Sequence, residues 1–376
     1  MHASSSEPTG PVSELVPLGE GDLPSASLRD RVRAALEGGD LVALPTETVY
    51  GIAARADDPD ALAALGSLKG RGQESPFTWH TSPERALRSG CELLPLLRRL
   101  AERYWPGPLT LVLRGAPSEA ALLERDGWTG VRQVAHAGTR ALIEELDFPV
   151  VLSSANGSGE EPLCDAEAIR ERFPRGLALI VDGGGTRMRE ASAVLAVGPG
   201  RFELLREGLL PIDDLRRTAG LRIVFACTGN TCRSPMAEGL ARKLLAERLA
   251  APGAPPADLA DFGFGVCSIG ILAGSGSPAA AHAIEVMGER GIDLSAHRSQ
   301  PAHPETLMRS DRIYGLTGSH VHALRQALPP SHADRVALLD PTGADIPDPI
   351  GGSRADYAAC AAAIERAILA RAKDWA

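Results

Sequence analysis

The chain has 376 residues, enough for two domains, and 44 % of them are hydrophobic, which is ample for packed cores. Its formal net charge of −9 excludes an overall basic protein of the nucleic-acid-binding kind, which leaves room only for a local basic patch. Six cysteines lack the paired spacing of a disulfide framework, which favours a reducing compartment. There is no leader of charged and then apolar residues, and no apolar run reaches the ~18 residues that span a bilayer. We therefore expect a soluble cytoplasmic protein without membrane contact.

Residues 1–27 are rich in Ser, Pro, Gly and Glu and are interpreted as a flexible leader. From residue 28 to residue 208, helical and strand patterns alternate, which indicates an α/β domain. Residues 209–220 are interpreted as a linker, and residues 221–376 as a second α/β domain. In the first domain, helices are predicted at Leu28–Glu37, Pro59–Leu68, Leu93–Tyr104 and Thr139–Leu146, and strands at Leu41–Leu44, Leu109–Leu113, Val131–Arg132, Val150–Ser153, Leu177–Val181, Ala193–Val197 and Phe202–Leu205.

Five short motifs stand out in the first domain. They are Pro45–Gly51 (PTETVYG), Lys69 with Arg71, Trp105–Thr110 (WPGPLT), Val131–Arg132, and Ser154 with Asn156. Each motif alone is a weak indicator of a family. Together they resemble the YrdC/Sua5 family, whose enzymes make threonylcarbamoyl-AMP from L-threonine, bicarbonate and ATP. Its product carries the threonylcarbamoyl group destined for adenosine 37 of tRNA. The resemblance therefore implies this activity, a YrdC-like twisted mixed sheet, and tRNA or the transfer machinery as further partners.

The resemblance gives these residues physical roles. A carboxylate and a triphosphate repel each other, so the cations Lys69, Arg71 and Arg132 are expected to line one cleft. The hydroxyls of Thr46 and Thr48 are expected to bind threonine or a phosphate. Mg²⁺ would accompany ATP, held by phosphates and water without protein ligands. The full set expected to bind ATP or threonine is Thr46, Thr48, Tyr50, Lys69, Arg71, Thr110, Arg132, Ser154, Asn156, Ser192 and Arg206.

Three departures from the family pattern leave a second interpretation open. Residues 74–80 read ESPFTWH where the family has N/K-P-L-x-x-H. Residues 132–134 read RQV where the family has R-x-P. Residues 192–193 read SA where it has a second hydroxyl. The alternative is a catalytically silent module that binds a nucleotide or RNA. In the plainest interpretation, residues 69–71 are only a solvated helix end and PTETVYG is only a turn.

The stretch Leu221–Glu238 (LRIVFACTGNTCRSPMAE) carries a second candidate site. Residues 223–225 indicate a buried strand, and residues 234–235 (SP) open an amphipathic helix, so a loop runs from Cys227 to Arg233. Backbone N–H groups at a helix N-terminus bind anions and favour a cysteine thiolate, and an arginine can hold two phosphoryl oxygens. The alternative is a buried structural cysteine beside a solvated arginine.

The spacing C-x5-R-S, with Gly229 and Asn230 inside the loop, resembles the low-molecular-weight phosphotyrosine phosphatase family over residues 221–376. The resemblance implies a doubly wound parallel sheet and a phosphatase that needs no cofactor and acts on phosphorylated proteins. Asn230 would brace the loop. The loop residues expected to bind phosphate are Thr228, Gly229, Asn230, Thr231, Cys232 and Ser234.

Three residues are expected to be catalytic in this second domain. Cys227 would attack phosphorus, Arg233 would hold the phosphoryl group, and an Asp-Pro aspartate would protonate the leaving group. Asp340 and Asp348 both precede proline. Asp348 is preferred because it stands in IPDPIGGS, before a helical pattern that begins at Ala355, as in the family.

Two positions bear on the substrate. Thr231 is polar where tyrosine-directed members carry Ile or Leu, and Ile350 replaces an aromatic residue after the Asp-Pro. A bacterial subgroup with CTGNTCRS acts on phosphoarginine, so protein phosphoarginine is preferred and phosphotyrosine is the alternative. Cys232 is expected to be a small buried residue, although it could cap Cys227 as a disulfide under oxidation. Surface or packing roles are expected for His282, His297, His303 and His320, which lack a metal-binding spacing.

Overall fold

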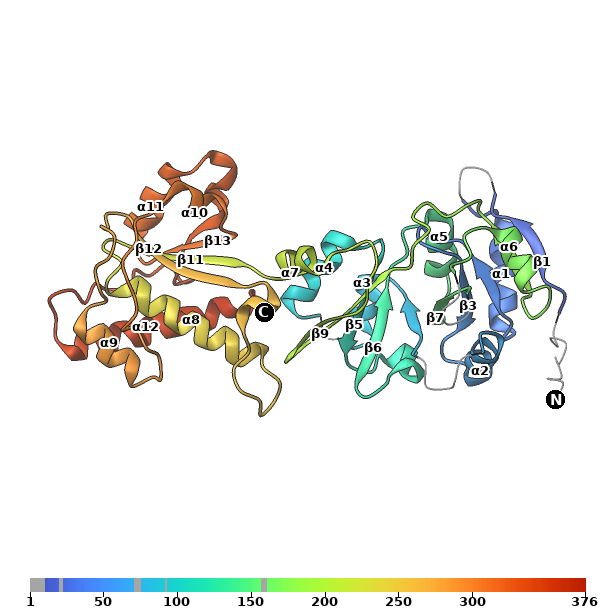
Figure 1. The fold of residues 1–376 in the computed structure, drawn as a ribbon, viewed down its shortest axis with the longest axis horizontal. Coiled ribbons are helices and arrows are strands. Elements are labelled where there is room, and N and C mark those ends of the chain that lie inside the picture. The colour runs from blue at the N-terminus through green and yellow to red at the C-terminus, as the bar shows by residue number, and fades with distance from the viewer. Residues whose placement is uncertain (1–10, 20–22, 71–75, 92, 157–160) are drawn as a thin grey trace. The chain divides into compact units, whose positions relative to one another are not determined.

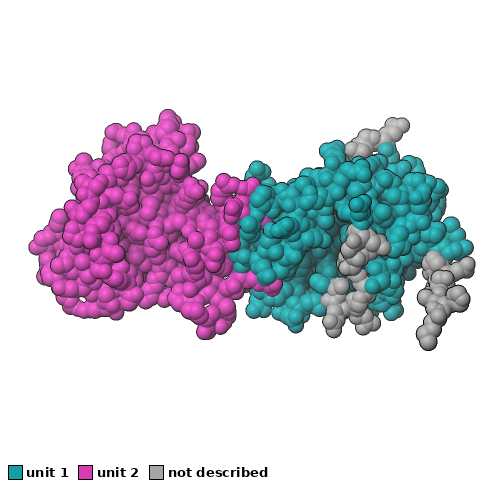
Figure 2. Space-filling model, in the orientation of Figure 1, with its two compact units in different colours: residues 1–93, 97–198, 202–212 teal, residues 94–96, 199–201, 213–376 magenta. Residues whose placement is uncertain are grey.

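The computed structural model describes residues 11–19, 23–70, 76–91, 93–156 and 161–376. The chain divides into two compact units, which Figure 2 shows in different colours. Unit 1 comprises residues 1–93, 97–198 and 202–212, and unit 2 comprises residues 94–96, 199–201 and 213–376. Arg71, which belongs to the predicted ATP and threonine site, lies outside the described residues, as do Glu74 and Ser75.

Unit 1 is built on a mixed sheet to which ten strands of the described chain contribute (Figure 1). The strand order is β1-β8-β2-β3-β7-β4-β6-β5-β9-β10. Strands β2, β3, β7 and β4 pair antiparallel in turn, whereas β4 with β6 and β5 with β9 pair in parallel. The bounds are β1 Glu14–Pro17, β2 Val42–Leu44, β3 Gly51–Arg55, β4 Thr78–His80, β5 Leu109–Arg114, β6 Trp128–Arg132, β7 Val150–Ser154, β8 Leu179–Asp182, β9 Ala193–Gly198 and β10 Arg201–Arg206.

Helix α1 (Ala26–Glu37) illustrates how the helices of this half pack on the sheet. Ser25 caps the helix by accepting the N–H of Leu28, and Leu28, Val32 and Leu36 form an apolar stripe four residues apart. The stripe is buried in a core with side chains from β2, β7, β8 and α5. The other helical segments are α2 Pro59–Leu68, α3 Pro83–Arg88, α4 Pro95–Tyr104, η2 Ser118–Leu123, α5 Ala137–Glu144 and α6 Ala166–Arg172.

Part of the predicted leader is folded, which corrects that interpretation. Strand β1 lies at the edge of the sheet and pairs in parallel with β8, and α1 begins before residue 28. The side chain of Val16 is buried in the core with α1, although the polar composition around it indicated a loose segment. Pro17 is compatible with an edge strand, where no second neighbour needs its missing N–H. Residues 1–10 and 20–22 of the leader lie outside the described residues.

Unit 2 contains a parallel sheet in the order β12-β11-β13-β14, with β11 Arg222–Cys227, β12 Gly265–Gly270, β13 Arg312–Gly315 and β14 Val336–Leu338. Five of the six residues of β11 are buried, as expected of an inner parallel strand. Figure 1 shows α8, α9 and α12 beside one face of this sheet and α10 and α11 beside the other. The helical segments are α7 Ile212–Ala219, α8 Arg233–Leu249, η3 Leu259–Phe262, α9 Ala281–Gly288, α10 Pro304–Met308, α11 Gly318–Ala327, η4 Pro330–Arg335 and α12 Arg354–Ala372.

The parallel strands of unit 2 bring their carboxyl ends to one edge of the sheet, where open α/β sheets place ligands. Cys227, Gly270 and Gly315 end β11, β12 and β13. A Cβ at Gly315 would lie 2.8 Å from the backbone nitrogen of Val321, so glycine is what lets α11 begin close to this edge. The two sheets confirm the predicted fold class, a mixed α/β sheet followed by a doubly wound parallel sheet.

No helix in the part of the chain that the structure describes combines the length and the apolar character that a bilayer crossing requires.

Candidate active sites

The loop after β11 carries the candidate nucleophile. Cys227 ends the strand, α8 begins at Arg233, and the loop between them turns at Asn230, whose φ is +55°. In the described chain the backbone N–H groups of Gly229 and Thr231 have no protein acceptor. Such N–H groups at a helix N-terminus form a binding site for an anion such as phosphate.

Donors surround the sulfur of Cys227. It accepts the N–H of Asn230 at 3.3 Å and lies 3.0 Å from Oγ of Ser234. The N–H of Asn230 favours a thiolate, which is the nucleophilic form of cysteine, and the Ser234 hydroxyl can turn to the sulfur from the carbonyl of Ile269. The predicted nucleophile therefore has the surroundings that its chemistry needs.

Asn230 holds the loop together. Its Nδ2 donates to Oγ of Ser234 and of Ser268, both at 2.9 Å, and its Oδ1 accepts the N–H of Gln300 at 2.8 Å. Its backbone oxygen lies 2.8 Å from Nε2 of His297. A buried amide with all of these partners fixes the left-handed turn, which asparagine tolerates better than most residues.

Asp348 is the aspartate that reaches the loop. Its carboxylate forms an ion pair with Nη2 of Arg233, and Nη1 donates to the carbonyl of Ile346 at 3.3 Å. The side chain of Arg233 is 6 % exposed and that of Asp348 is 40 % exposed, so the acid stands on the open side of the site. Asp340 accepts the hydroxyl and the N–H of Thr342, which lowers the pKa of Asp340. Of the two candidate acids, Asp340 is thus hydrogen-bonded within a local turn, whereas Asp348 is paired with the arginine of the phosphate loop.

Two histidines touch the loop, a role that their dispersed spacing did not predict. His297 contacts the backbone of Asn230, and Nε2 of the buried His320 lies 3.0 Å from Oγ1 of Thr228. Burial, and then the charge of Arg233, lowers the pKa of His320. Both contacts join elements that are far apart in the chain, which is why motif spacing could not reveal them.

The remaining loop residues face α12. Oγ1 of Thr231 lies 3.6 Å from the sulfur of Cys232, which in turn lies 3.3 Å from the hydroxyl of Tyr357. Burial raises the pKa of Tyr357, and it raises that of Cys360 to about 12. These two groups are neutral at pH 7 and add no charge to the phosphate loop.

In unit 1, Glu47 and Arg132 form a buried ion pair between the loop after β2 and the end of β6. Arg132 also donates from Nη2 to Oγ1 of Thr48 at 2.9 Å and from Nε to the carbonyl of Gly107 at 3.0 Å. The second carboxylate oxygen of Glu47 accepts the N–H of Ala135 at 2.9 Å. The ion pair joins the PTETVYG and WPGPLT motifs to Arg132, although Glu47 itself was not among the predicted site residues.

The other PTETVYG side chains bind within the protein. Oγ1 of Thr46 lies 2.8 Å from Oγ1 of Thr48 and donates to the carbonyl of Val49 at 2.6 Å. The hydroxyl of Tyr50 donates to the carbonyl of Gly184 at 3.0 Å, and burial raises the pKa of Tyr50 to about 12. These contacts make the loop rigid, and ligand binding by the three side chains stays a prediction.

Lys69 lies against the end of β7. Its ammonium group donates to Oγ of Ser153 at 2.8 Å and to the carbonyl of Ser154, and the residue is buried. Asn156 follows this strand by two residues. The ammonium group of Lys69 is thus held against the end of β7, beside Ser153 and Ser154.

A third cluster lies near the start of β9. Oγ1 of Thr110 lies 3.0 Å from Oγ of Ser192, and Arg206 donates to the Ser192 carbonyl and hydroxyl, both at 2.9 Å. Leu111 of β5 pairs with Val131 of β6, so the Arg132 cluster and the cluster of Thr110, Ser192 and Arg206 lie at the same end of these two strands. The Lys69 cluster lies at the end of β7, whereas His80, which pairs with Arg132, also pairs with Val150 at the start of β7.

His80 is a residue of this region that the sequence did not single out. It ends β4, pairs with Arg132 across the β4–β6 ladder, and has neither ring nitrogen hydrogen-bonded in the described structure. Burial, and then the charge of Arg132, lowers its pKa well below 6.5, so the ring is neutral at pH 7. Oγ1 of the adjacent Thr81 is also unpaired, and a cavity of about 10 Å³ beside both has room for one water. Unpaired buried polar groups are rare, and the available signal was the histidine that ends ESPFTWH, as in the family pattern.

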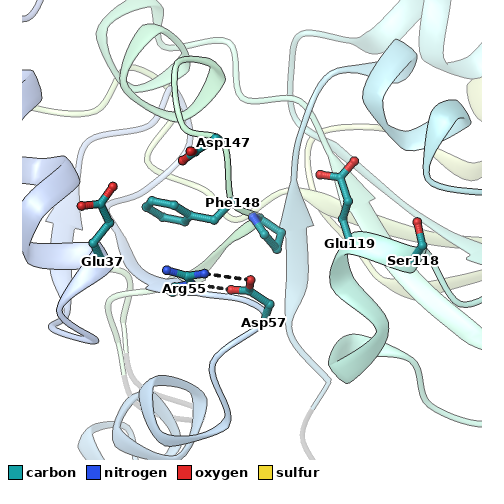
Figure 3. Close-up of a pocket in the computed structure, with 8 residues that line it drawn as sticks. Glu37, Arg55, Asp57, Ser118, Glu119, Asp147 and Phe148 are labelled. Carbon is teal, nitrogen blue, oxygen red and sulfur yellow. Dashed lines mark hydrogen bonds and ion pairs between the residues drawn. The ribbon is translucent and has the colours of Figure 1, made fainter.

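A hollow of about 470 Å³ lies at the opposite end of the β3–β7 pair (Figure 3). Arg55 pairs there with the start of β7, whereas Ser154 ends that strand. The guanidinium of Arg55 lies over the ring of Phe148 and forms an ion pair with Asp57, and Glu119 is paired with an arginine of α3. The charges that line the hollow are therefore paired with one another or with neighbouring side chains, and the hollow lies at the end of the β3–β7 pair that is opposite Ser154. No group of three His, Cys, Asp or Glu side chains that could hold a metal ion occurs in the described residues.

Comparison with known families gives two matches. Residues 34–208 match the Sua5, YciO and YrdC family, described as "Telomere recombination". Residues 222–374 match the family described as "Low molecular weight phosphotyrosine protein phosphatase".

Individual relatives agree with these matches. A putative threonylcarbamoyl-AMP synthase of Mycobacterium tuberculosis is 33 % identical over 195 residues, which cover 50 % of this chain and 87 % of that protein. The threonylcarbamoyl-AMP synthase of Pyrococcus abyssi is 35 % identical over 205 residues, and the chain spans 60 % of its length. The YwlE arginine phosphatase from Geobacillus stearothermophilus is 33 % identical, with 41 % of this chain and 91 % of that chain covered and a TM-score of 0.34. A doubly substituted variant of P. abyssi Sua5 is 23 % identical, with 87 % and 98 % covered and a TM-score of 0.50.

Together the folds and sites define a two-part enzyme, with the buried cations Lys69 and Arg132 in one unit and a cysteine-containing loop at a helix N-terminus in the other. The chain belongs to the YrdC/Sua5 threonylcarbamoyl-AMP synthase family through its first half and to the low-molecular-weight phosphotyrosine protein phosphatase family through its second half. This confirms both resemblances seen in the sequence.

Proposed function

We propose that the chain is a bifunctional enzyme, which makes threonylcarbamoyl-AMP in unit 1 and hydrolyses phosphorylated proteins in unit 2. The observation that carries the phosphatase half is the convergence of Cys227, Arg233 and Asp348 on one loop. The observation that supports the synthase half is Arg132, which pairs with Glu47 and donates to Thr48 of PTETVYG and to Gly107 of WPGPLT.

The phosphatase reaction follows from the loop contacts. The Cys227 thiolate attacks phosphorus in line, a sulfur–phosphorus bond forms, and the bond to the leaving group breaks. Arg233 and the loop N–H groups neutralise the phosphoryl oxygens, while protonated Asp348 gives its proton to the leaving nitrogen or oxygen. Asp348 then takes a proton from water, whose oxygen attacks phosphorus and releases phosphate and the thiolate.

Protein phosphoarginine is the proposed substrate, with phosphotyrosine second. Thr231 presents a hydroxyl in the loop, and Ile350, which follows the acid and is 70 % exposed, offers an aliphatic surface where a phenol ring would favour an aromatic one. The similarity to a YwlE arginine phosphatase supports the same choice.

The phosphatase test measures phosphate release from a phosphoarginine protein and from a phosphotyrosine peptide at equal concentration. We expect a higher kcat/KM on phosphoarginine than on phosphotyrosine, and loss of both activities in Cys227→Ser. In Thr231→Ile we expect a smaller ratio of the two kcat/KM values. A higher kcat/KM on phosphotyrosine would reverse the substrate assignment, and activity in Cys227→Ser would remove the mechanism.

The proposed synthase reaction joins three substrates. The amine of L-threonine attacks bicarbonate and forms a carbamate with loss of water. A carbamate oxygen then attacks the α-phosphorus of ATP, and pyrophosphate leaves. Lys69, Arg132 and Arg206 would neutralise the carboxylate and the phosphates, which otherwise repel each other. Mg²⁺ would be held by the ATP phosphates and water, and it would neutralise charge on the phosphates.

Pyrophosphate release by the full chain with ATP, L-threonine and bicarbonate tests this half, in a Cys227→Ser background that removes phosphatase activity. We expect release that requires all three substrates and falls in Lys69→Ala. The matched control is Lys243→Ala, which removes a lysine of unit 2. If ATP binds without any pyrophosphate release, the unit is the silent nucleotide- or RNA-binding module. Transfer of the product to adenosine 37 of tRNA is the proposed use of the synthase activity.

A further inference from the structure

The imidazole of His320 bridges two threonine hydroxyls at the phosphate loop. Nε2 lies 3.0 Å from Oγ1 of Thr228, and Nδ1 lies 2.9 Å from Oγ1 of Thr317. His320 is buried, and both nitrogens are used. Thr317 is the N-cap of α11 and also accepts the backbone N–H of His320, so the ring is fixed on its own helix and presents its far nitrogen to the loop.

The same helix end contacts the segment that carries the proposed acid. Asp345 accepts the N–H of Gly318 at 2.7 Å, and the N–H of Ile346 donates to the carbonyl of Leu316 at 2.8 Å. Ile346 also accepts a hydrogen bond from Arg233. The N-terminus of α11 is thus a common support for the nucleophile loop on one side and the acid segment on the other.

Charge and burial keep this ring neutral. The groups that act on it are Arg233, whose charge disfavours the protonated ring, and Asp348 and Asp345, which favour it, while burial has the largest effect. Burial and Arg233 prevail, and the pKa of His320 lies below its ordinary value. A neutral imidazole has one donor and one acceptor nitrogen. One ring nitrogen of His320 therefore donates to one threonine hydroxyl, and the other accepts from the second.

We propose that His320 is a positioning residue of the phosphatase site, which fixes the Thr228 wall of the phosphate loop through Nε2 and ties it to the segment that carries Asp348. The proposal rests on the proposed phosphatase function. His320 acts on the reaction through Thr228 and does not touch the reacting atoms.

The two nitrogens can be tested separately because two amides imitate them. The amide of Gln reaches about as far as Nε2, so His320→Gln retains the contact with Thr228. The amide of Asn reaches about as far as Nδ1, so His320→Asn retains only the contact with Thr317. The matched control is His322→Asn, which changes an exposed histidine of the same helix.

Each full-length variant is assayed for kcat and KM on a phosphoarginine protein, for binding of inorganic vanadate as a phosphate-site probe, and for melting temperature. We expect His320→Asn to lower kcat/KM and vanadate affinity by about tenfold, the effect of losing one hydrogen bond to a polar group in the site. His320→Gln is expected to stay near the wild type in both, and His322→Asn to match the wild type.

Thr228→Val completes a double-mutant cycle. If His320 acts through Thr228, the Thr228→Val/His320→Asn protein binds vanadate no more weakly than Thr228→Val alone. The proposal is overturned if His320→Asn retains vanadate affinity and His320→Gln loses it. It is also overturned if the effects of Thr228→Val and His320→Asn on affinity are additive, or if the losses of affinity follow the losses in melting temperature. A wild-type protein that hydrolyses no phosphorylated substrate removes the proposed function, whereas vanadate binding still decides the role of His320.

Discussion

Arg233 and Asp348 form an ion pair although 115 positions separate them in the chain. The pair exists because Arg233 begins α8 directly after β11, while the segment after β14 reaches the same edge of the parallel sheet. In the proposed mechanism, Arg233 exchanges the carboxylate of Asp348 for a phosphoryl group, and Asp348 is then free to act as the proposed acid.

Asp348→Asn is expected to lower kcat on phosphoarginine protein by about 10²–10³-fold, because an amide cannot give a proton to the leaving group. The matched control is Asp340→Asn, which changes the other aspartate that precedes proline. It is expected to keep kcat near the wild type, since Asp340 contacts Thr342 in a turn. Steady-state kinetics decides between them. A larger loss in Asp340→Asn would reverse the assignment of the acid.

Asn230→Ala is expected to destabilise unit 2 by about 1–3 kcal/mol, because it removes the hydrogen bonds of the buried amide to Ser234, Ser268 and Gln300. Asn230→Gly is the control for the backbone, because glycine relieves the positive φ but also removes the amide. We expect Asn230→Gly to be less destabilised than Asn230→Ala. Hydrogen exchange of the β11 amides measures both. Equal protection in wild type and both variants would show that the amide network contributes nothing to stability.

Local features of the chain made the phosphate loop predictable. Cys227, Arg233 and Ser234 lie within eight positions of one another, so a strand pattern, a loop and a helix start define their geometry. Asp348 was reachable only through the family resemblance, because its contact depends on how β11 and the segment after β14 meet.

Contacts made by isolated residues were not predictable. Glu47 and His80 gain their surroundings from Arg132, which lies 85 positions after Glu47 and on the strand beside His80. A single sequence gives no sign that a polar residue in an apolar strand will be buried. Strand β1 was missed for a related reason, since its short apolar stretch lies in a leader rich in Ser, Pro, Gly and Glu, and the burial of Val16 depends on β8 and α1.

Glu47→Gln is expected to disrupt the synthase site far more than the same change at Glu119. The Glu47–Arg132 pair is buried, and the loss of one partner of a buried pair costs about 3–5 kcal/mol. The Glu119 side chain is 35 % exposed beside Arg85, and such pairs are worth about 0–1 kcal/mol. Glu47→Gln should therefore lower both the melting temperature and pyrophosphate release, and Glu119→Gln neither. Equal effects in calorimetry and the pyrophosphate assay would contradict the assignment of Glu47 as the support of Arg132.

The buried His80 gives unit 1 a pH dependence whose sign can be stated. Its pKa in the folded protein lies well below 6.5, whereas the unfolded chain has the ordinary value. The unfolded state therefore binds a proton first as the pH falls. The contribution of His80 to stability is complete above about pH 6.5, and it declines by up to about 1.4 kcal/mol per pH unit below that, until the folded-state pKa is reached.

His80→Leu removes this titration and fills a similar volume. We expect its free energy of unfolding to fall less than that of the wild type between pH 7 and pH 5.5, in urea titrations that follow unit 1. His303→Leu is the matched control, because it removes an exposed histidine of unit 2. If the wild type and His80→Leu lose the same stability over this range, His80 is protonated as easily in the folded protein as in the unfolded chain. That outcome would contradict the lowered pKa of the buried ring.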